Sequence, residues 1–245
     1  EDPALIINNG VNRGAASDFY QIGGSPREAE ITMIERDLAI ALETGAIVNI
    51  QHISTKEGVE LVRKAKAVPG NNVHAEATPH HIALTEEAVI EKGTLAKVNP
   101  PIRTEEDRQA ILAGLKDGTI DIIATDHAPH APEEKAKDIT QAPSGMLGLE
   151  TAFALANRVL VKENGMPFIE MVDKFTVAPA KMYHLPYGDV RVGKIADIVL
   201  VDPNEKWVVE GFASKSSNSP FIGEEMTGRI RYTVCEGKIA YSLVK

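Results

Sequence analysis

The first half of the chain alternates between helical and strand-like hydrophobic patterns. Apolar residues between 31 and 42 recur at helical spacing, and the helix that they predict ends near Gly45. The run AIVNI, residues 46–50, then predicts a short buried strand. Ser54 with Glu57 has the pattern of a capping box, which predicts that the next helix, TKEGVELVRKAKAV, begins here.

Two more helix and strand patterns follow. The run VHAEA, residues 73–77, predicts a strand that leads into the sequence TPHH. EDRQAILAGLKDG, residues 106–118, predicts a helix, and TIDIIA, residues 119–124, predicts the strand after it. Helices and strands that alternate at this spacing are typical of a parallel sheet with crossover helices.

The pattern changes in the last quarter of the chain. Residues 148–165 predict a helix, and residues 166–185 predict a pair of helices. After Gly188 the sequence has short apolar runs separated by Gly, Asp and Pro turns, which predicts antiparallel strands. We therefore expect two domains, residues 1–187 and a β-rich subdomain of residues 188–245.

Polar side chains that can bind a metal follow three of the predicted strands. His52 follows the first strand, His80 and His81 follow the second, and Asp126 follows the third. In a parallel α/β barrel, the carboxyl ends of all strands open on the face that holds the active site. A complete eight-stranded barrel needs about 250 residues. The chain therefore forms either a smaller open sheet or, as we expect, the C-terminal part of a larger protein.

Each of these residues also has a simpler interpretation. Asp126 can bind a divalent metal and move protons, or it can cap a turn. The imidazole of His52 is a common zinc ligand, or it is a structural residue that makes ordinary hydrogen bonds. Thr78 precedes a proline and should be extended. If His80 and His81 continue the strand, their side chains point to opposite sides, and at most one of them faces the site.

The loops add candidates for substrate binding. In KVNPPIR, residues 97–103, two prolines restrict the backbone and can hold the Asn99 amide for hydrogen bonding. His130 is either a substrate contact or a surface histidine. Gly145 lets the backbone approach a ligand, or only shapes a turn. Lys135 is expected to be solvated.

Composition excludes some classes of protein. Of the 245 residues, 43% are hydrophobic and 25% are charged, which is ordinary for a globular protein with a core. The formal net charge of −9 argues against nucleic acid or an anionic membrane surface as a partner. No apolar run is long enough for a membrane span. The single Cys235 is compatible with a reducing cytoplasm, where we expect the protein.

Four motifs in this order, QHIST, TPHH, KVNPPIR and ATDHAPHAPEEK, resemble the dihydroorotase family within the amidohydrolase superfamily. The resemblance extends from Glu1 to Lys245. It implies an α/β fold, in which this chain forms the last strands and helices of a (β/α)8 TIM-type barrel and a small C-terminal β-sandwich portion.

The resemblance also implies roles for individual residues. His52 would be a metal ligand from the sixth strand of the barrel. Asp126, from the eighth strand, would be both a metal ligand and the catalytic acid and base. Asn99 and His130 match positions that contact the substrate, and Ser144 with Gly145 matches a segment whose backbone touches it. The implied cofactor is zinc, with one or two ions in a complete site.

Part of the family's pattern has no counterpart in this sequence. The His-x-His pair of the first strand, the substrate-binding Arg beside it, and the ligands of the fourth and fifth strands are missing. In relatives, the pair Glu1-Asp2 lies just behind a ligand His-Cys. We therefore expect the chain alone to be inactive, because it carries only part of the metal site.

The activity that the resemblance implies is interconversion of L-dihydroorotate and N-carbamoyl-L-aspartate in pyrimidine biosynthesis. The substrate is then a small molecule, and a homodimer and an association with aspartate transcarbamoylase are the protein partners to consider. Two alternatives remain. One is a related cyclic amidase, a hydantoinase or an allantoinase. The other is a non-catalytic dihydroorotase-like subunit that scaffolds aspartate transcarbamoylase.

Overall fold

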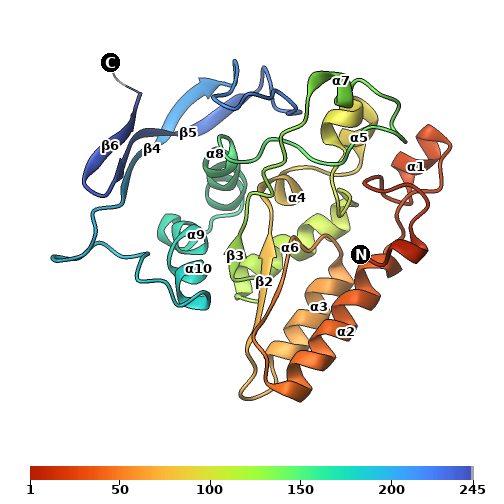
Figure 1. Cartoon of the computed structure of the whole chain (residues 1–245), viewed down its shortest axis with the longest axis horizontal. Helices are drawn as coiled ribbons and strands as arrows, with labels where there is room; N and C mark the ends of the chain where they lie inside the picture. Colours follow the sequence, from red (N-terminus) through yellow and green to blue (C-terminus); the bar gives the residue numbers. More distant parts are fainter. Residues whose placement is uncertain (244–245) are drawn as a thin grey trace. The chain divides into compact units, whose positions relative to one another are not determined.

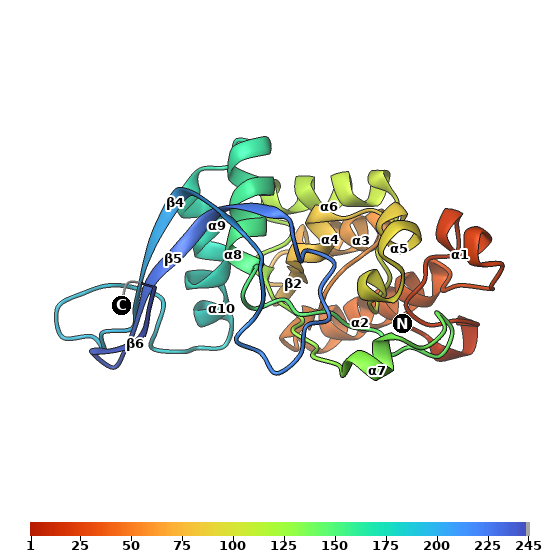
Figure 2. The same ribbon diagram turned by 90° about the horizontal axis from the view of Figure 1, so that it is seen from above.

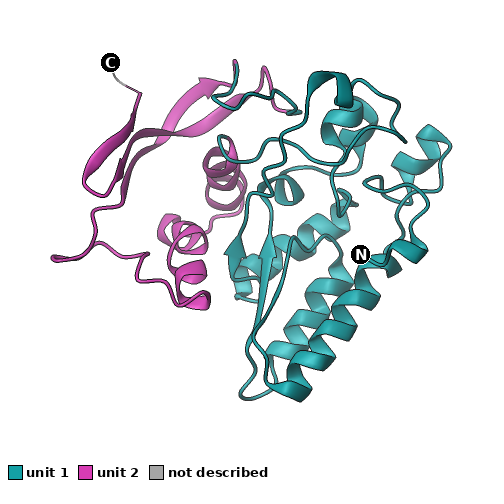
Figure 3. Cartoon of the chain, viewed as in Figure 1, with its two compact units in different colours: residues 1–150, 211–220 teal, residues 151–210, 221–245 magenta. Residues whose placement is uncertain are grey.

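The computed structural model describes residues 1–243, which form two compact units (Figures 1 and 3). Unit 1 consists of Glu1–Glu150 together with Gly211–Pro220. Unit 2 consists of Thr151–Glu210 together with the chain from Phe221 onward. Across the described residues 1–243, no helix is both long and apolar enough to cross a membrane.

A three-stranded parallel sheet lies at the centre of unit 1. Its strands are β1 (Val48–Ile50), β2 (Val73–Ala77) and β3 (Ile122–Ile123), in the order β1-β2-β3. The strands are consecutive neighbours and each pair is parallel, which confirms the sheet predicted from the alternating pattern. Their carboxyl ends therefore lie at the same edge.

Three helices connect and cover these strands. They are α2 (Glu28–Thr44), α3 (Lys56–Lys66) and α6 (Glu105–Asp117). α3 packs against α2, α6 and β2, and both ribbon views show α2 and α3 side by side (Figures 1 and 2). The apolar faces of the three helices are buried, and each fully buried side chain such as Val59 or Val62 contributes about 1.5–3 kcal/mol.

The ends of these helices follow capping rules, with one correction to the sequence prediction. α2 ends at Gly45, whose φ of 72° is left-handed. α3 begins at Thr55, whose hydroxyl accepts a hydrogen bond from Gly58 N at 3.1 Å. The predicted capping box at Ser54 is wrong, because the Ser54 hydroxyl donates to the Glu30 carboxylate instead.

Short elements complete unit 1. α4 (Pro79–Ala83) begins at Thr78, which is extended as predicted, with φ −105° and ψ 156°. The expectation that His80 and His81 continue the strand is wrong, because both lie in this helix and both are buried. The remaining elements are η1 (Pro3–Leu5), α1 (Ala15–Tyr20), α5 (Glu87–Lys92), η2 (Gly93–Ala96) and α7 (Pro132–Lys135).

Unit 2 contains helices and an antiparallel sheet. Its helices are α8 (Ala152–Ala156), the π-helix η3 (Asn157–Glu163), α9 (Phe168–Phe175) and α10 (Val177–Met182). The sheet has the order β4-β5-β6, formed by Ile198–Val208, Glu225–Cys235 and Lys238–Ser242. The predicted helical pair and the predicted antiparallel strands are both present.

A buried amide joins the helical and sheet parts of unit 2. Asn157 Nδ2 donates to Pro203 O and Thr227 O, each at 2.9 Å. One parallel and one antiparallel sheet in a mixed α/β chain agree with the coarse fold class predicted from the sequence.

Candidate active site

His52 and Asp126 occupy equivalent places at the edge of the parallel sheet. His52 follows β1 and Asp126 follows β3. Both residues have positive φ, 38° for His52 and 46° for Asp126. A left-handed conformation is uncommon for residues other than glycine, and it concentrates at functional sites. The backbone thus turns sharply at both strand ends and presents these side chains there.

The two side chains also interact electrostatically. Burial raises the pKa of the Asp126 carboxyl above its usual value, and the nearby His52 imidazole lowers it in part. An imidazole affects a carboxyl in this way only when the two groups are close together. The structure therefore brings together the two residues that the sequence predicts as metal ligands.

The donor atoms fit a zinc-type ion. His52 Nδ1 is buried and has no hydrogen-bond partner among the described residues. An unpartnered imidazole nitrogen beside a half-buried carboxylate is a suitable pair of donors for zinc. A catalytic zinc ion typically has three protein ligands, and no group of three or more His, Cys, Asp or Glu side chains suited to a metal occurs within residues 1–243. The two residues alone therefore do not make a complete zinc site.

His80 and His81 lie close enough to His52 to interact with it electrostatically. His81 makes two ring contacts, Nδ1 to Thr78 Oγ1 at 2.8 Å and Nε2 to Pro100 O at 3.0 Å. Burial lowers the pKa of His81 to about 3, so its ring is neutral. His81 therefore links the end of β2 to the loop that carries Asn99. The Nε2 atom of His80 is buried and has no hydrogen-bond partner among the described residues.

Asn99 lies in the loop between η2 and α6. The peptide bond between Asn99 and Pro100 is cis, and Asn99 Oδ1 is buried without a partner in the described chain. A pocket of about 240 Å³ is lined by Asn99, Pro100 and His52, together with residues from α2 and β1. The structure thus places Asn99 beside the His52 end of the site.

His130, Ser144 and Gly145 form a second cluster. His130 Nε2 contacts Ser144 O at 2.9 Å, and Gly145 N donates to Lys97 O at 2.8 Å. Gly145 has a φ of 135°, and a Cβ at this position would come within 2.6 Å of the Ala128 Cβ. Only glycine fits here. The cluster is joined through Lys97 to the loop that carries Asn99.

The sequence motifs assign no role to three residues that organise this cluster, although two of them, Lys97 and Lys135, lie within the motifs. Asn218 Nδ2 donates to Ala128 O at 2.9 Å and to Gly145 O at 3.1 Å. Lys97 and Lys135 also bind backbone oxygens of this region, and both are buried. The expectation that Lys135 is solvated is wrong, because its side chain turns back under the loop instead of extending into water.

His127 has a structural position within the motif. Its Nδ1 accepts hydrogen bonds from Gly148 N at 3.1 Å and from Leu149 N at 3.3 Å. A nitrogen that accepts from two N–H groups carries no proton, so the proton of the neutral ring is on Nε2. His127 thereby holds the backbone at Gly148 and Leu149 in place.

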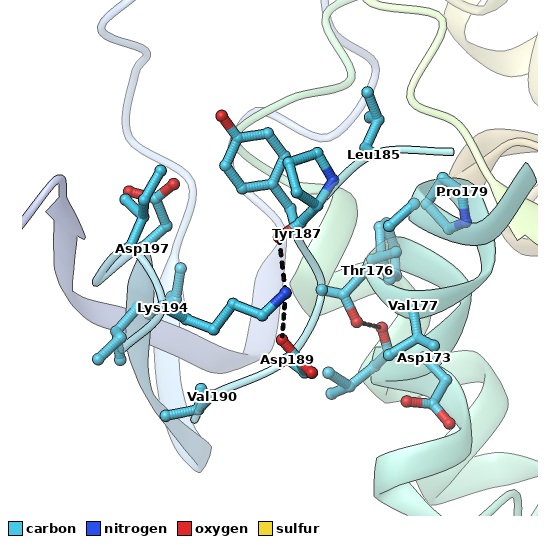
Figure 4. Close-up of a pocket in the computed structure, with 18 of the residues that line it drawn as sticks. Asp173, Thr176, Val177, Pro179, Leu185, Tyr187, Asp189, Val190, Lys194 and Asp197 are labelled. Atoms are coloured by element: carbon cyan, nitrogen blue, oxygen red, sulfur yellow. Dashed lines mark hydrogen bonds and ion pairs between the residues drawn. The ribbon is translucent and has the colours of Figure 1, made fainter. Parts of the chain in front are cut away.

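A second pocket lies within unit 2 and has a different character (Figure 4). It has a volume of about 630 Å³ and is lined mainly by apolar residues of α9, α10 and the segment 185–199. Its Lys194 ammonium points toward Asp189, at 3.7 Å, and donates to Pro186 O at 3.3 Å. The pair of His52 and Asp126 in unit 1 is therefore the better candidate for a catalytic site.

Comparisons with known proteins identify the family of the chain. A model of the amidohydrolase family matches residues 27–240. The chain therefore belongs to the amidohydrolase family, whose members generally depend on a metal ion.

Similar proteins narrow the class further and confirm the resemblance found in the motifs. The chain is 49% identical to a dihydroorotase of Clostridioides difficile, over 99% of this chain and 57% of that protein. It is also 49% identical to a dihydroorotase of Clostridium acetobutylicum, over 98% and 57%. The chain thus spans less than two thirds of the length of these relatives.

Solved structures show the same fold. An L-hydantoinase (dihydropyrimidinase) from Arthrobacter aurescens superimposes with a TM-score of 0.83 and 29% identity, over 90% of this chain and 50% of that one. A dihydropyrimidinase from Brevibacillus agri gives a TM-score of 0.84 at 24% identity, over 95% and 51%, and so supports the fold alone.

Proposed function

We propose that the protein to which this chain belongs is a dihydroorotase, which interconverts L-dihydroorotate and N-carbamoyl-L-aspartate. The observation that carries the proposal is the electrostatically coupled pair of His52 and Asp126, at the ends of parallel strands in a chain nearly half identical to proteins of that name. The decisive assay measures opening of the dihydroorotate ring, and its reverse, with the full-length protein.

In this proposal, His52 and Asp126 are ligands of zinc in a site that holds one or two ions. A bound zinc ion supplies Lewis-acid activation of the attacking water and of the ring carbonyl. The Asp126 carboxylate accepts a proton from the water and passes it to the departing amide nitrogen. Burial raises the pKa of the Asp126 carboxyl in the metal-free chain, and the charge of a bound zinc ion would lower it.

The other candidate residues would bind the substrate. Asn99 has an unpartnered amide oxygen beside His52, which can accept a hydrogen bond from the ring. His130 and the Ser144-Gly145 backbone would lie on the side of the substrate carboxylate. The substrate is an anion in a protein of net charge −9, so local positive charge from the metal and from buried cations would favour its binding.

Removing the His52 side chain is expected to lower metal affinity. Glycine is the matched replacement, because it tolerates the positive φ at this position. Loss of a group that only supports a ligand costs 10- to 100-fold in metal affinity, so loss of a ligand should cost about 100-fold or more. The measurement is zinc content of the dialysed full-length His52→Gly variant by elemental analysis.

The control for this variant is His184→Gly, which removes an exposed histidine that also has positive φ. It should retain the parental zinc content. Equal zinc stoichiometry in His52→Gly and the parent would remove His52 from the ligand set.

A related cyclic amidase is the second candidate, because a solved hydantoinase superimposes over 90% of the chain at 29% identity. A substrate panel of dihydroorotate, hydantoin, dihydrouracil and allantoin separates these activities in the full-length protein. Preference for an uncharged ring over dihydroorotate would favour the hydantoinase. No turnover of any ring by metal-loaded protein would favour the non-catalytic subunit.

The finer architecture belongs to the same proposal. The chain would supply the last strands and helices of a (β/α)8 barrel through residues 1–187, and part of a β-sandwich through residues 188–245. By itself it would be inactive, because a catalytic zinc ion typically has three protein ligands and His52 with Asp126 supplies two. A cytoplasmic location, a homodimer and an association with aspartate transcarbamoylase remain hypotheses from the family resemblance.

A further inference from the structure

The segment from Ile139 to Gly145 rests on two buried ammonium groups. Lys97 Nζ donates to Ile139 O and to Ala142 O, both at 2.7 Å. Lys135 Nζ donates to Pro143 O at 2.9 Å and to Gly145 O at 3.0 Å. The two lysines are only 3% and 5% exposed.

Other groups complete the attachment of this segment. The carbonyl of Ser144 contacts His130 Nε2, and Gly145 N donates back to Lys97 O. The Gly145 carbonyl accepts a second bond, from Asn218 Nδ2. Consecutive carbonyls from Ala142 to Gly145 thus all point at donors, which fixes the orientation of each peptide plane between them.

Packing alone does not explain the choice of lysine at these two positions. Burial lowers the pKa of Lys135 to about 8, with a further lowering by the charge of Lys97. Burial also lowers the pKa of Lys97, which the Asp138 carboxylate offsets in part. A methionine would fill nearly the same volume without desolvating a charge, but it would leave the four carbonyls without these donors, so the ammonium groups serve to hold the segment.

We propose that Lys97 and Lys135 are positioning residues, which hold the Ser144-Gly145 backbone and the His130 ring in place for an anionic substrate. Their positive charges, buried beneath the same segment, also favour the substrate's negative charge. This inference rests on the proposed function, because Ser144, Gly145 and His130 are substrate contacts only within it. In this inference, the two lysines do not bind the substrate themselves. They bind the backbone of residues that would bind it.

The test compares Lys97→Met and Lys135→Met with Lys137→Met in the full-length, metal-loaded protein. Lys137 is exposed and lies two residues beyond Lys135, so it controls for loss of one positive charge from the same region. Displacement of a substrate contact by about 1 Å costs up to about 100-fold. We expect KM for dihydroorotate to rise about 10- to 100-fold in each buried variant, while kcat falls less and zinc content is unchanged.

Hydrogen–deuterium exchange provides a readout that does not depend on activity. In both buried variants, amides of residues 139–146 should exchange faster than in the parent, and those of α3 should not change. Lys137→Met should match the parent in KM and in exchange.

The outcomes separate this inference from the proposed function. If the parent does not open the dihydroorotate ring, the proposed function fails. Hydrogen–deuterium exchange then still shows whether the two lysines hold the segment from Ile139 to Gly145 in place. If the parent is active and both buried variants keep the parental KM, the positioning role is overturned. It is also overturned if both variants lose apparent kcat at constant KM, or fail to fold while Lys137→Met folds, because the lysines would then be structural only.

Discussion

Replacing Asp126 by asparagine in the full-length protein is expected to lower kcat for dihydroorotate by about 10²- to 10⁴-fold, the usual contribution of a positioned acid or base. Asparagine has nearly the same shape as aspartate, and it tolerates the positive φ of 46° at this position. The variant therefore removes the proton-accepting carboxylate with little change to the backbone. Initial rates at saturating substrate give kcat in both reaction directions.

Zinc content of the same variant separates the two roles assigned to Asp126. If zinc is retained and kcat falls, the carboxylate acts as a proton carrier. If zinc is lost in proportion to activity, its role as a ligand accounts for the effect. Asp117→Asn, at the exposed end of α6, is the control and should behave as the parent. Near-parental turnover by Asp126→Asn would contradict both roles.

The long helices and the strands of unit 1 could be predicted from the sequence because their signals are local, whereas its short helices were not predicted. Helical periodicity and Gly45 define α2, and a capping threonine with a buried apolar face defines α6. β3 is a weaker case, because only Ile122 and Ile123 pair with β2 although the predicted strand had six residues. Strand length depends on the neighbouring strand, which a local pattern does not contain.

The pair of His52 and Asp126 could also be predicted, since both follow buried strands that are expected to be parallel. The contacts of Lys97, Lys135 and Asn218 could not, although both lysines lie in the motifs. Asn218 is 73 residues from Gly145 in the chain, so their contact depends on how the loop 211–220 folds back within unit 1. Lysine is almost never buried without partners. When the partners are backbone carbonyls, which every residue has, the sequence does not show which residues the lysine binds.

The sequence also misplaced the partner of Ser54, and the reason is the buried network around Arg103. The Arg103 guanidinium is 2% exposed and donates to Ser54 Oγ at 2.8 Å. It also donates to Asn12 Oδ1 at 2.9 Å and to Glu1 Oε1 at 3.1 Å. Because Ser54 is held by Arg103 and Glu30, it is not available to cap α3. The network joins the chain after His52 to the loop that carries Asn99.

Arg103→Met is therefore expected to have the largest effect on stability. It would leave the carboxylates of Glu1 and Glu30 buried near each other without their shared cation. Removing one partner of a buried ion pair typically costs about 3–5 kcal/mol in the free energy of unfolding. The measurement is urea unfolding of the full-length protein, with the midpoint and the slope fitted separately.

The matched control is Arg36→Met, which removes an exposed arginine that pairs with Asp37 on the surface of α2. Exposed ion pairs contribute about 0–1 kcal/mol, so this variant should unfold near the parental midpoint. A loss below about 1 kcal/mol in Arg103→Met would mean that water or a shifted side chain compensates the two carboxylates. In that case the network would not be what holds the His52 and Asn99 segments together.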